Sequence, residues 1–140
     1  MLLSLLTERV DPASALTLKL PWPPSVNRYW RHAARGGHAV TYVSRDGLAY
    51  KAAVAEAVRW QASGHTPYSG QVAVRVDLYP PSKREYDADN RLKGLFDAFT
   101  QAGVWVDDKL PQQIYVEKKA PCPPKGRAVV TIWKIVRGAA

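Results

Sequence analysis

The sequence predicts a single α+β domain with a mixed sheet and two main helices. Residues 16–20 and 72–78 have apolar side chains at every second position, which is typical of strands. Residues 45–62 and 90–102 have apolar side chains three and four positions apart, which is typical of helices. The chain has 140 residues, 46% of them hydrophobic, and this is enough for one core. No repeat or internal boundary divides it.

The first half is expected to contain a strand, a hairpin and a helix. The strand covers 16–20 and ends at a proline-rich segment. Residues 28–35 and 40–43 are expected to pair as a hairpin that turns at two adjacent glycines. Ser44 is a suitable N-cap for a helix that extends to about residue 62.

The second half is expected to hold a strand, a helix and three further extended segments. The strand covers 72–78, and a pair of prolines follows it. The helix covers 90–102 and ends at Gly103, which can adopt the left-handed conformation of a C-cap. The extended segments are 104–107, 113–119 and 127–136.

The first fifteen residues are expected to form a disordered or loosely packed extension ahead of a domain that covers 16–137. Their apolar run, MLLSLL, is too short to span a bilayer. It lacks the basic start and the small-residue cleavage site of a signal peptide. We therefore expect no association with a membrane.

The charge balance predicts an anionic partner. The chain has 20 Lys and Arg residues against 12 Asp and Glu residues, a formal net charge of +8. Nucleic acid is the commonest partner of a small basic domain, although a ribosomal or merely soluble basic protein has the same balance. Cys122 is the single cysteine, which excludes an intrachain disulfide and a cysteine-based zinc site. This fits a cytoplasmic protein.

Two acidic pairs flank the second helix. Asp87 and Asp89 precede it, and Asp107 and Asp108 follow it. The helix would rise about 18 Å, and an extended segment 104–108 would cover about 17 Å, so the chain can return the second pair to the helix start. Carboxylates about 4 Å apart repel by roughly 4 kcal/mol, and a divalent cation relieves this repulsion. A site made only of oxygen ligands favours Mg²⁺ or Mn²⁺ over zinc.

Each member of this set also has a simpler interpretation. Asp89 alone can N-cap the helix while Asp87 is solvated. Lys93 lies four residues from both Asp89 and Asp97, so it can form surface ion pairs of about 0.3–0.5 kcal/mol each. It can equally stabilise charge that develops on a phosphate. The matching lengths of the helix and the return segment favour a joint site.

Basic residues occur in two clusters. The first is mixed with aromatic rings, which suits phosphate contact with base stacking, and equally suits rings that lie in the core. This first cluster contains Arg28, Arg31 and Arg35 among Trp22, Tyr29 and Trp30. The second is a solvated face that also attracts phosphates, and contains Lys118, Lys119, Lys125 and Arg127. The three histidines have no spacing typical of metal ligands.

The segments PWPPSVNRYWRH and DADNRLKGLFDAFTQAGVWVDD resemble the RusA family of Holliday junction resolvases, small endonucleases of phages and prophages. The resemblance covers the chain from Leu18 to the last strand. It implies a homodimeric, metal-dependent crossover junction endodeoxyribonuclease that resolves four-way DNA junctions by paired nicks in recombination and repair. The catalytic aspartates of the family fall on Asp87, Asp89 and Asp108, and its essential lysine falls on Lys93. Asn90 and Asp107 match as neighbours in supporting positions.

The resemblance and the residue pattern together predict a mechanism. The three aspartates are expected to hold Mg²⁺, or Mn²⁺ as a substitute, which activates a water to attack phosphorus. Lys93 is expected to stabilise the charge of the transition state. The residues expected to contact DNA are Arg28, Arg31, Arg35, Lys83, Arg84, Lys118 and Lys119. Two alternatives stay open: a non-catalytic phage DNA-binding or regulatory protein, and a nuclease for other branched DNA.

Overall fold

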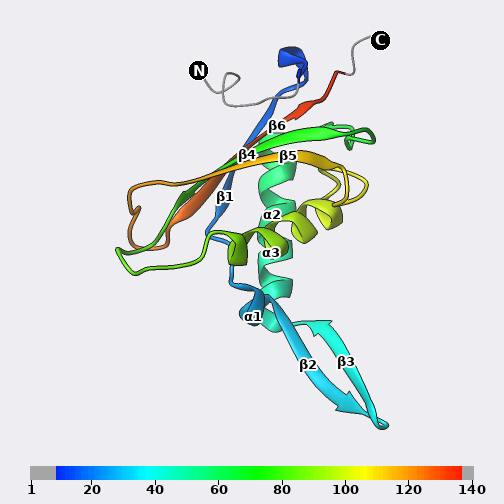
Figure 1. The fold of residues 1–140 in the computed structure, drawn as a ribbon, viewed down its shortest axis with the longest axis vertical. Coiled ribbons are helices and arrows are strands. Elements are labelled where there is room, and N and C mark those ends of the chain that lie inside the picture. Colours follow the sequence, from blue (N-terminus) through cyan, green and yellow to red (C-terminus); the bar gives the residue numbers. More distant parts are fainter. Residues whose placement is uncertain (1–8, 137–140) are drawn as a thin grey trace.

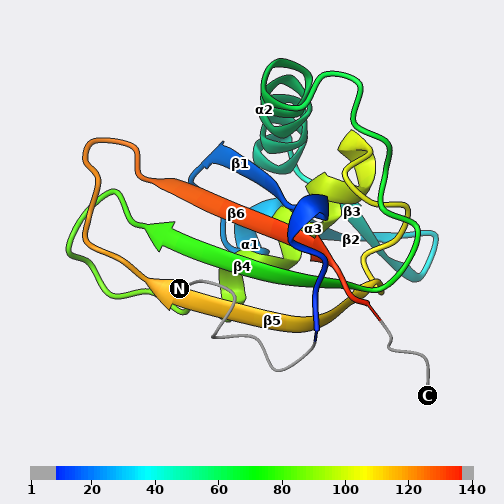
Figure 2. The same cartoon turned by 90° about the horizontal axis from the view of Figure 1, so that it is seen from above.

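The computed structural model describes residues 9–136, which form a mixed sheet with helices on one of its faces (Figures 1 and 2). The sheet has four strands in the order β1-β6-β4-β5. A separate two-stranded hairpin, β2-β3, projects away from the sheet beyond the helices (Figure 1). The predicted α+β class with a mixed sheet and two main helices is confirmed, and a third helix, α1, is only one turn long.

The sheet joins the two halves of the chain. β6 pairs antiparallel with both β1 and β4, whereas β4 and β5 are parallel. A parallel pair needs a crossover connection, and the segment that contains helix α3 supplies it. The strands are β1 (Leu16–Pro21), β4 (Val72–Tyr79), β5 (Pro111–Lys118) and β6 (Arg127–Lys134).

Local sequence signals set the ends of the two main helices. α2 (Arg45–Gln61) begins after Ser44, whose hydroxyl accepts a hydrogen bond from Gly47 N at 3.0 Å, as predicted. α3 (Asp89–Ala102) ends at Gly103, which has a φ of 77° and is the predicted left-handed C-cap. No helix within residues 9–136 is both long enough and apolar enough to cross a membrane.

The hairpin forms where the sequence predicts it, although it begins two residues later. Val26–Tyr29 fold as the short helix α1, so the first strand, β2, covers Trp30–Arg35 and pairs with β3 (His38–Val43). Gly36 and Gly37 form the turn, with φ values of 57° and 79°. Both strands are largely exposed.

Tyr29 fixes the packing between the three helices. Its side chain is fully buried, and its hydroxyl donates a hydrogen bond to Asp97 of α3 at 2.5 Å. Two glycines make room for it. A Cβ at Gly94 of α3 would lie 2.8 Å from Tyr29 Cδ2, and one at Gly47 of α2 would lie 2.6 Å from the Tyr29 carbonyl oxygen. The start of α3 is therefore held against a rigid core contact.

The prediction of a strand at 104–107 is wrong. Only Trp105 forms a bridge there, with Tyr68. Its side chain is buried against Phe96 and Phe99, each with a ring separation of 5.2 Å, and Trp105 Nε1 donates to Thr100 Oγ1 at 2.9 Å. These contacts of Trp105 hold the segment against α3, so the segment does not pair as a strand of the sheet.

Part of the predicted N-terminal extension is attached to the sheet. Val10 forms a bridge with Ile135, and a 3₁₀ turn follows at Pro12–Ser14. Ser14 Oγ accepts a hydrogen bond from Lys134 N at 2.7 Å, and its carbonyl accepts one from the Tyr68 hydroxyl at 2.6 Å. Residues 1–8, the rest of the predicted extension, lie outside the described residues.

Candidate active site

Asp87 and Asp89 lie where the loop after β4 enters α3. Both are exposed, and neither carboxylate makes a hydrogen bond or ion pair within residues 9–136. The N-cap position belongs to Ala88, and Asp89 is already the first helical residue. The simpler interpretation, in which Asp89 caps the helix, is therefore wrong. The oxygen atoms of both carboxylates are free to bind a ligand.

Lys93 is exposed one helical turn after Asp89 and is also unpaired within the described part of the chain. The carboxylate of Asp97, its other expected partner, instead accepts from the Tyr29 hydroxyl and lies 3.6 Å from Lys51 Nζ. The ladder of surface ion pairs therefore does not form. The ammonium group of Lys93, one turn from Asp89, thus has no partner in the part of the chain that the structure describes.

The second acidic pair occupies a turn. Asp107 Oδ1 accepts a hydrogen bond from Lys109 N at 2.8 Å, which closes the turn that leads into β5. Asp108 is exposed, and its carboxylate makes no hydrogen bond or ion pair among residues 9–136. Of the two, Asp108 therefore has the free carboxylate, while Asp107 stabilises its own loop.

The predicted meeting of the two acidic pairs does not occur within one chain. The turn with Asp108 precedes the first residue of β5, whereas Lys118, the last residue of β5, donates a hydrogen bond to the Tyr86 carbonyl at 2.6 Å. The pairs thus lie toward opposite ends of β5, because that strand must run parallel to β4. Within residues 9–136, no group of three or more His, Cys, Asp or Glu side chains is arranged to hold a metal ion.

The acidic pair at the start of α3 nevertheless suits a hard cation. Mg²⁺ is commonly held by one or two carboxylates, with waters and substrate phosphates as its other ligands. Asp87 and Asp89, exposed and unpaired, supply oxygen ligands of this kind. A site that also contains Asp108 needs a second protomer or a rearrangement of segment 104–110. Asn90, in the first turn of α3, is partly buried, and its supporting role stays a prediction.

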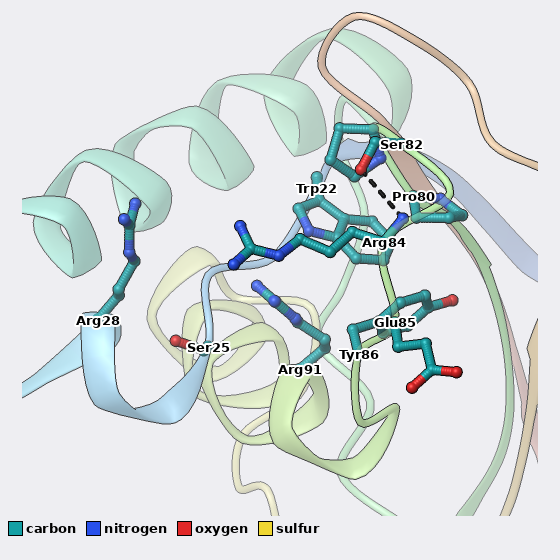
Figure 3. A pocket seen from close by; sticks show the side chains of 10 residues that line it. Trp22, Ser25, Arg28, Pro80, Ser82, Arg84, Glu85, Tyr86 and Arg91 are labelled. Carbon is teal, nitrogen blue, oxygen red and sulfur yellow. Dashed lines mark hydrogen bonds between the residues drawn. The ribbon is translucent and has the colours of Figure 1, made fainter.

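A pocket of about 410 Å³ includes Tyr86 and Arg91 in its lining, which flank the acidic pair in the sequence (Figure 3). Arg28, Arg84 and Arg91 line it, together with the rings of Trp22 and Tyr86. They come from α1 and the segment before it, from the loop after β4, and from the first turn of α3. Arg91 is not among the residues that we predicted to contact DNA. Its position two residues after Asp89 was the only signal in the sequence.

The aromatic residues of the first basic cluster are divided between the core and the pocket. Tyr29 is fully buried, and Trp30 packs edge-on against it with a ring separation of 4.9 Å, so Tyr29 belongs to the core. Trp22 is partly buried and packs edge-on against Tyr86, with ring centres 5.0 Å apart. Trp22 therefore forms a wall of the pocket.

The other residues predicted to contact DNA are spread over several surfaces. Arg31 and Arg35 are exposed on the hairpin, and Lys83 is exposed in the loop before the acidic pair. Lys118 is held over the Tyr86 ring, 4.6 Å from its centre. Lys119 is paired with Glu117 and lies 4.0 Å from Asp77, so much of its charge is compensated within the protein.

Comparison with known proteins identifies the family. The family model described as "Endodeoxyribonuclease RusA" matches residues 21–132, which include both acidic pairs and Lys93. The chain belongs to the RusA family. The RusA crossover junction endodeoxyribonuclease of Escherichia coli K12 is 38% identical over 116 residues, which are 83% of this chain and 92% of that protein. The predicted resemblance to the RusA family is confirmed.

Relatives from other organisms have nearly the same coverage. The RusA crossover junction endodeoxyribonuclease of Shigella sonnei is 36% identical over 116 residues, 83% of this chain and 92% of the relative. The protein of the same name in Enterobacteria phage 82 is 36% identical over 115 residues, 82% of this chain and 91% of the relative. RusA-family members similar to this chain thus occur in both bacteria and a phage.

Proposed function

We propose that this chain is a metal-dependent endodeoxyribonuclease that resolves four-way DNA junctions by paired symmetrical nicks in recombination and repair. One observation carries the proposal: at the start of α3 in a RusA-family chain, the side chains of Asp87, Asp89 and Lys93 are exposed and have no partner among residues 9–136. The formal net charge of +8 suits a DNA substrate. The cytoplasm of a bacterial or phage-infected cell is the proposed place of action.

The residues at the start of α3 have different roles in the proposed reaction. Asp87 and Asp89 would hold Mg²⁺, or Mn²⁺ in its place, which when bound supplies an activated water and polarises a phosphoryl oxygen. Lys93 stabilises the negative charge that develops on the phosphoryl oxygens or on the leaving oxygen. No carboxylate among the described residues pairs with the Lys93 ammonium group, so its positive charge is available to the phosphate.

The enzyme is proposed to act as a homodimer. A two-fold symmetric dimer places two acidic sites on a DNA junction that is itself nearly two-fold symmetric. Exposed apolar side chains support a protein contact, because Trp60 and Leu48 of α2 are 78% and 57% exposed. A second protomer is also one way in which Asp108 can join Asp87 and Asp89.

A cleavage assay on a synthetic four-way junction, with and without Mg²⁺, tests the proposal. We expect two symmetrically placed nicks with ligatable ends in the presence of the metal, and little cutting of linear duplex. Equal cutting of duplex and junction would overturn the resolvase function and leave a general nuclease. Tight binding of the junction without any cutting would instead favour a non-catalytic DNA-binding protein.

A further inference from the structure

The pocket beside the acidic pair concentrates positive charge that no salt bridge among the described residues compensates. Arg28, Arg84 and Arg91 line it, and none of them is in a salt bridge within residues 9–136. Glu85 is the one acidic residue of the lining, and its carboxylate points away from the guanidinium groups of Arg84 and Arg91 (Figure 3). Three arginine side chains around one hollow repel each other, and an anion bound between them would offset this repulsion.

Arg91 is held in place for such an anion. Its Nη1 donates a hydrogen bond to the Pro23 carbonyl at 3.0 Å, and its guanidinium group lies over the Trp22 ring, 5.3 Å from the ring centre. Its Nε is buried and has no hydrogen-bond partner among the described residues. An incoming anion would compensate a charge that is partly desolvated and already oriented.

We propose that this arginine pocket binds a backbone phosphate of the DNA strand that enters the Asp87–Asp89 site, with Arg91 at its base and Arg28 and Arg84 at its rim. Arginine is suited to this because its planar fork can donate two hydrogen bonds to one phosphate. Phosphate contacts fix the register of a protein on DNA. Because Arg91 is two residues from Asp89, a phosphate held here sets which neighbouring phosphodiester bond reaches the acidic pair.

The inference deepens the proposed function, and its first test is junction affinity without cleavage. Arg28 and Arg84 are exposed, so Arg28→Ala and Arg84→Ala should leave the fold intact, which thermal melting checks. Each should weaken binding of a labelled four-way junction in EDTA about tenfold, because each removes a charge-assisted contact. Arg59→Ala, an exposed arginine of α2 outside the pocket, is the matched control and should change affinity less than twofold. Equal small effects of all three substitutions would overturn the inference.

The second test identifies the phosphate. Each phosphate around the branch point is replaced in turn by an uncharged methylphosphonate, and binding by the wild type and by Arg84→Ala is compared. At one position the wild type should lose about tenfold in affinity, while Arg84→Ala should lose nothing further there. Losses that simply add at every position would contradict a shared phosphate site.

The third test observes Arg91 directly and does not depend on catalysis. Its side-chain Nε–H resonance, assigned by its loss in Arg91→Lys, should shift with a short single-stranded oligonucleotide at concentrations where inorganic phosphate has no effect. An equal response to inorganic phosphate would show a site for small anions and overturn the assignment to DNA. If the chain binds junctions but never cuts them, the proposed function fails. The variant affinities and the methylphosphonate substitutions still show whether the pocket binds a phosphate. If it cuts normally and the arginine variants bind like wild type, the pocket inference fails alone.

Discussion

Asp87, Asp89 and Lys93 differ from the charged residues around them because their side chains are not used for folding. Asp97 is bound by Tyr29 and Lys51, and Asp107 closes a turn onto Lys109. Exposed charges without partners contribute little to stability. Substitutions of these three residues should therefore change activity and leave folding nearly unchanged.

Lys93→Ala tests the role of the ammonium group in the chemical step. We expect single-turnover cleavage of a four-way junction to slow by about 10²–10³-fold, because a positioned donor to the transition state is lost. Junction affinity, measured in EDTA, should stay within about twofold of wild type. Lys51→Ala removes a lysine that faces Asp97 instead and should cleave at nearly the normal rate. A wild-type rate for Lys93→Ala would show that this side chain is only a surface charge.

Residues whose partners are near in the sequence were predictable, whereas Arg91 was not. Ser44 and Gly103 were predictable as helix ends because a cap depends on its immediate neighbours. Arg91 was missed because the residues that hold it are distant in sequence, Trp22 and Pro23 at the end of β1. Within its own helix, only its position two residues after Asp89 distinguishes it from a solvated arginine.

At the scale of elements, α3 is positioned by the fit of its glycine against Tyr29. Gly94→Ala should improve helix propensity by about 1 kcal/mol, but its Cβ would lie 2.8 Å from a buried ring carbon. We expect a net loss of about 1–3 kcal/mol in the free energy of unfolding, measured by urea denaturation. Gly70→Ala is the control, because a Cβ there meets nothing within 4 Å, and it should be nearly neutral. Equal stability of the two variants would contradict the tight contact.

Buried tyrosines between the helices and the sheet predict a loss of stability at alkaline pH. Burial raises the pKa of Tyr68 to about 12 and also raises the pKa values of Tyr29 and Tyr50. In the unfolded chain the pKa of tyrosine is about 10. Above about pH 10 the unfolded state therefore loses protons that the folded state keeps, and the free energy of unfolding falls as the pH rises.

Urea denaturation at about pH 9 and about pH 11 measures this slope. Tyr50→Phe removes one of the buried hydroxyls and should make the loss between the two pH values smaller. Tyr42→Phe, at a side chain that is 45% exposed, should leave the loss as it is in the wild type. A wild-type stability that does not change between the two pH values would contradict the burial of these groups.

The direction that the chain takes after α3 was not predicted from the sequence. The lengths of the helix and of segment 104–108 permit a return to the helix start, but length does not determine direction. The actual direction depends on two non-local contacts, the bridge of Trp105 with Tyr68 and the pairing of β5 with β4. Strand alternation predicted β4 and most of β5 and β6, but it does not indicate which strands become neighbours.

At the scale of the whole molecule, the proposal is a symmetric dimer that works on a symmetric substrate. Light scattering at micromolar concentration should report about twice the 15.5 kDa mass of the chain. Trp60→Glu, at a side chain that is 78% exposed, introduces a charge without disturbing the core and tests whether this face of α2 is in the contact. A monomer that still makes paired nicks would refute the dimer.

Cleavage and junction binding by the aspartate variants show whether the acidic residues form the active site. Asp87→Asn, Asp89→Asn and Asp108→Asn are each assayed on a four-way junction with Mg²⁺, and their junction affinities are measured in EDTA. We predict that all three lose cleavage and keep affinity within about threefold of wild type, because basic side chains and not these acids bind the phosphates. Normal cleavage by all three variants would contradict the assignment of the active site.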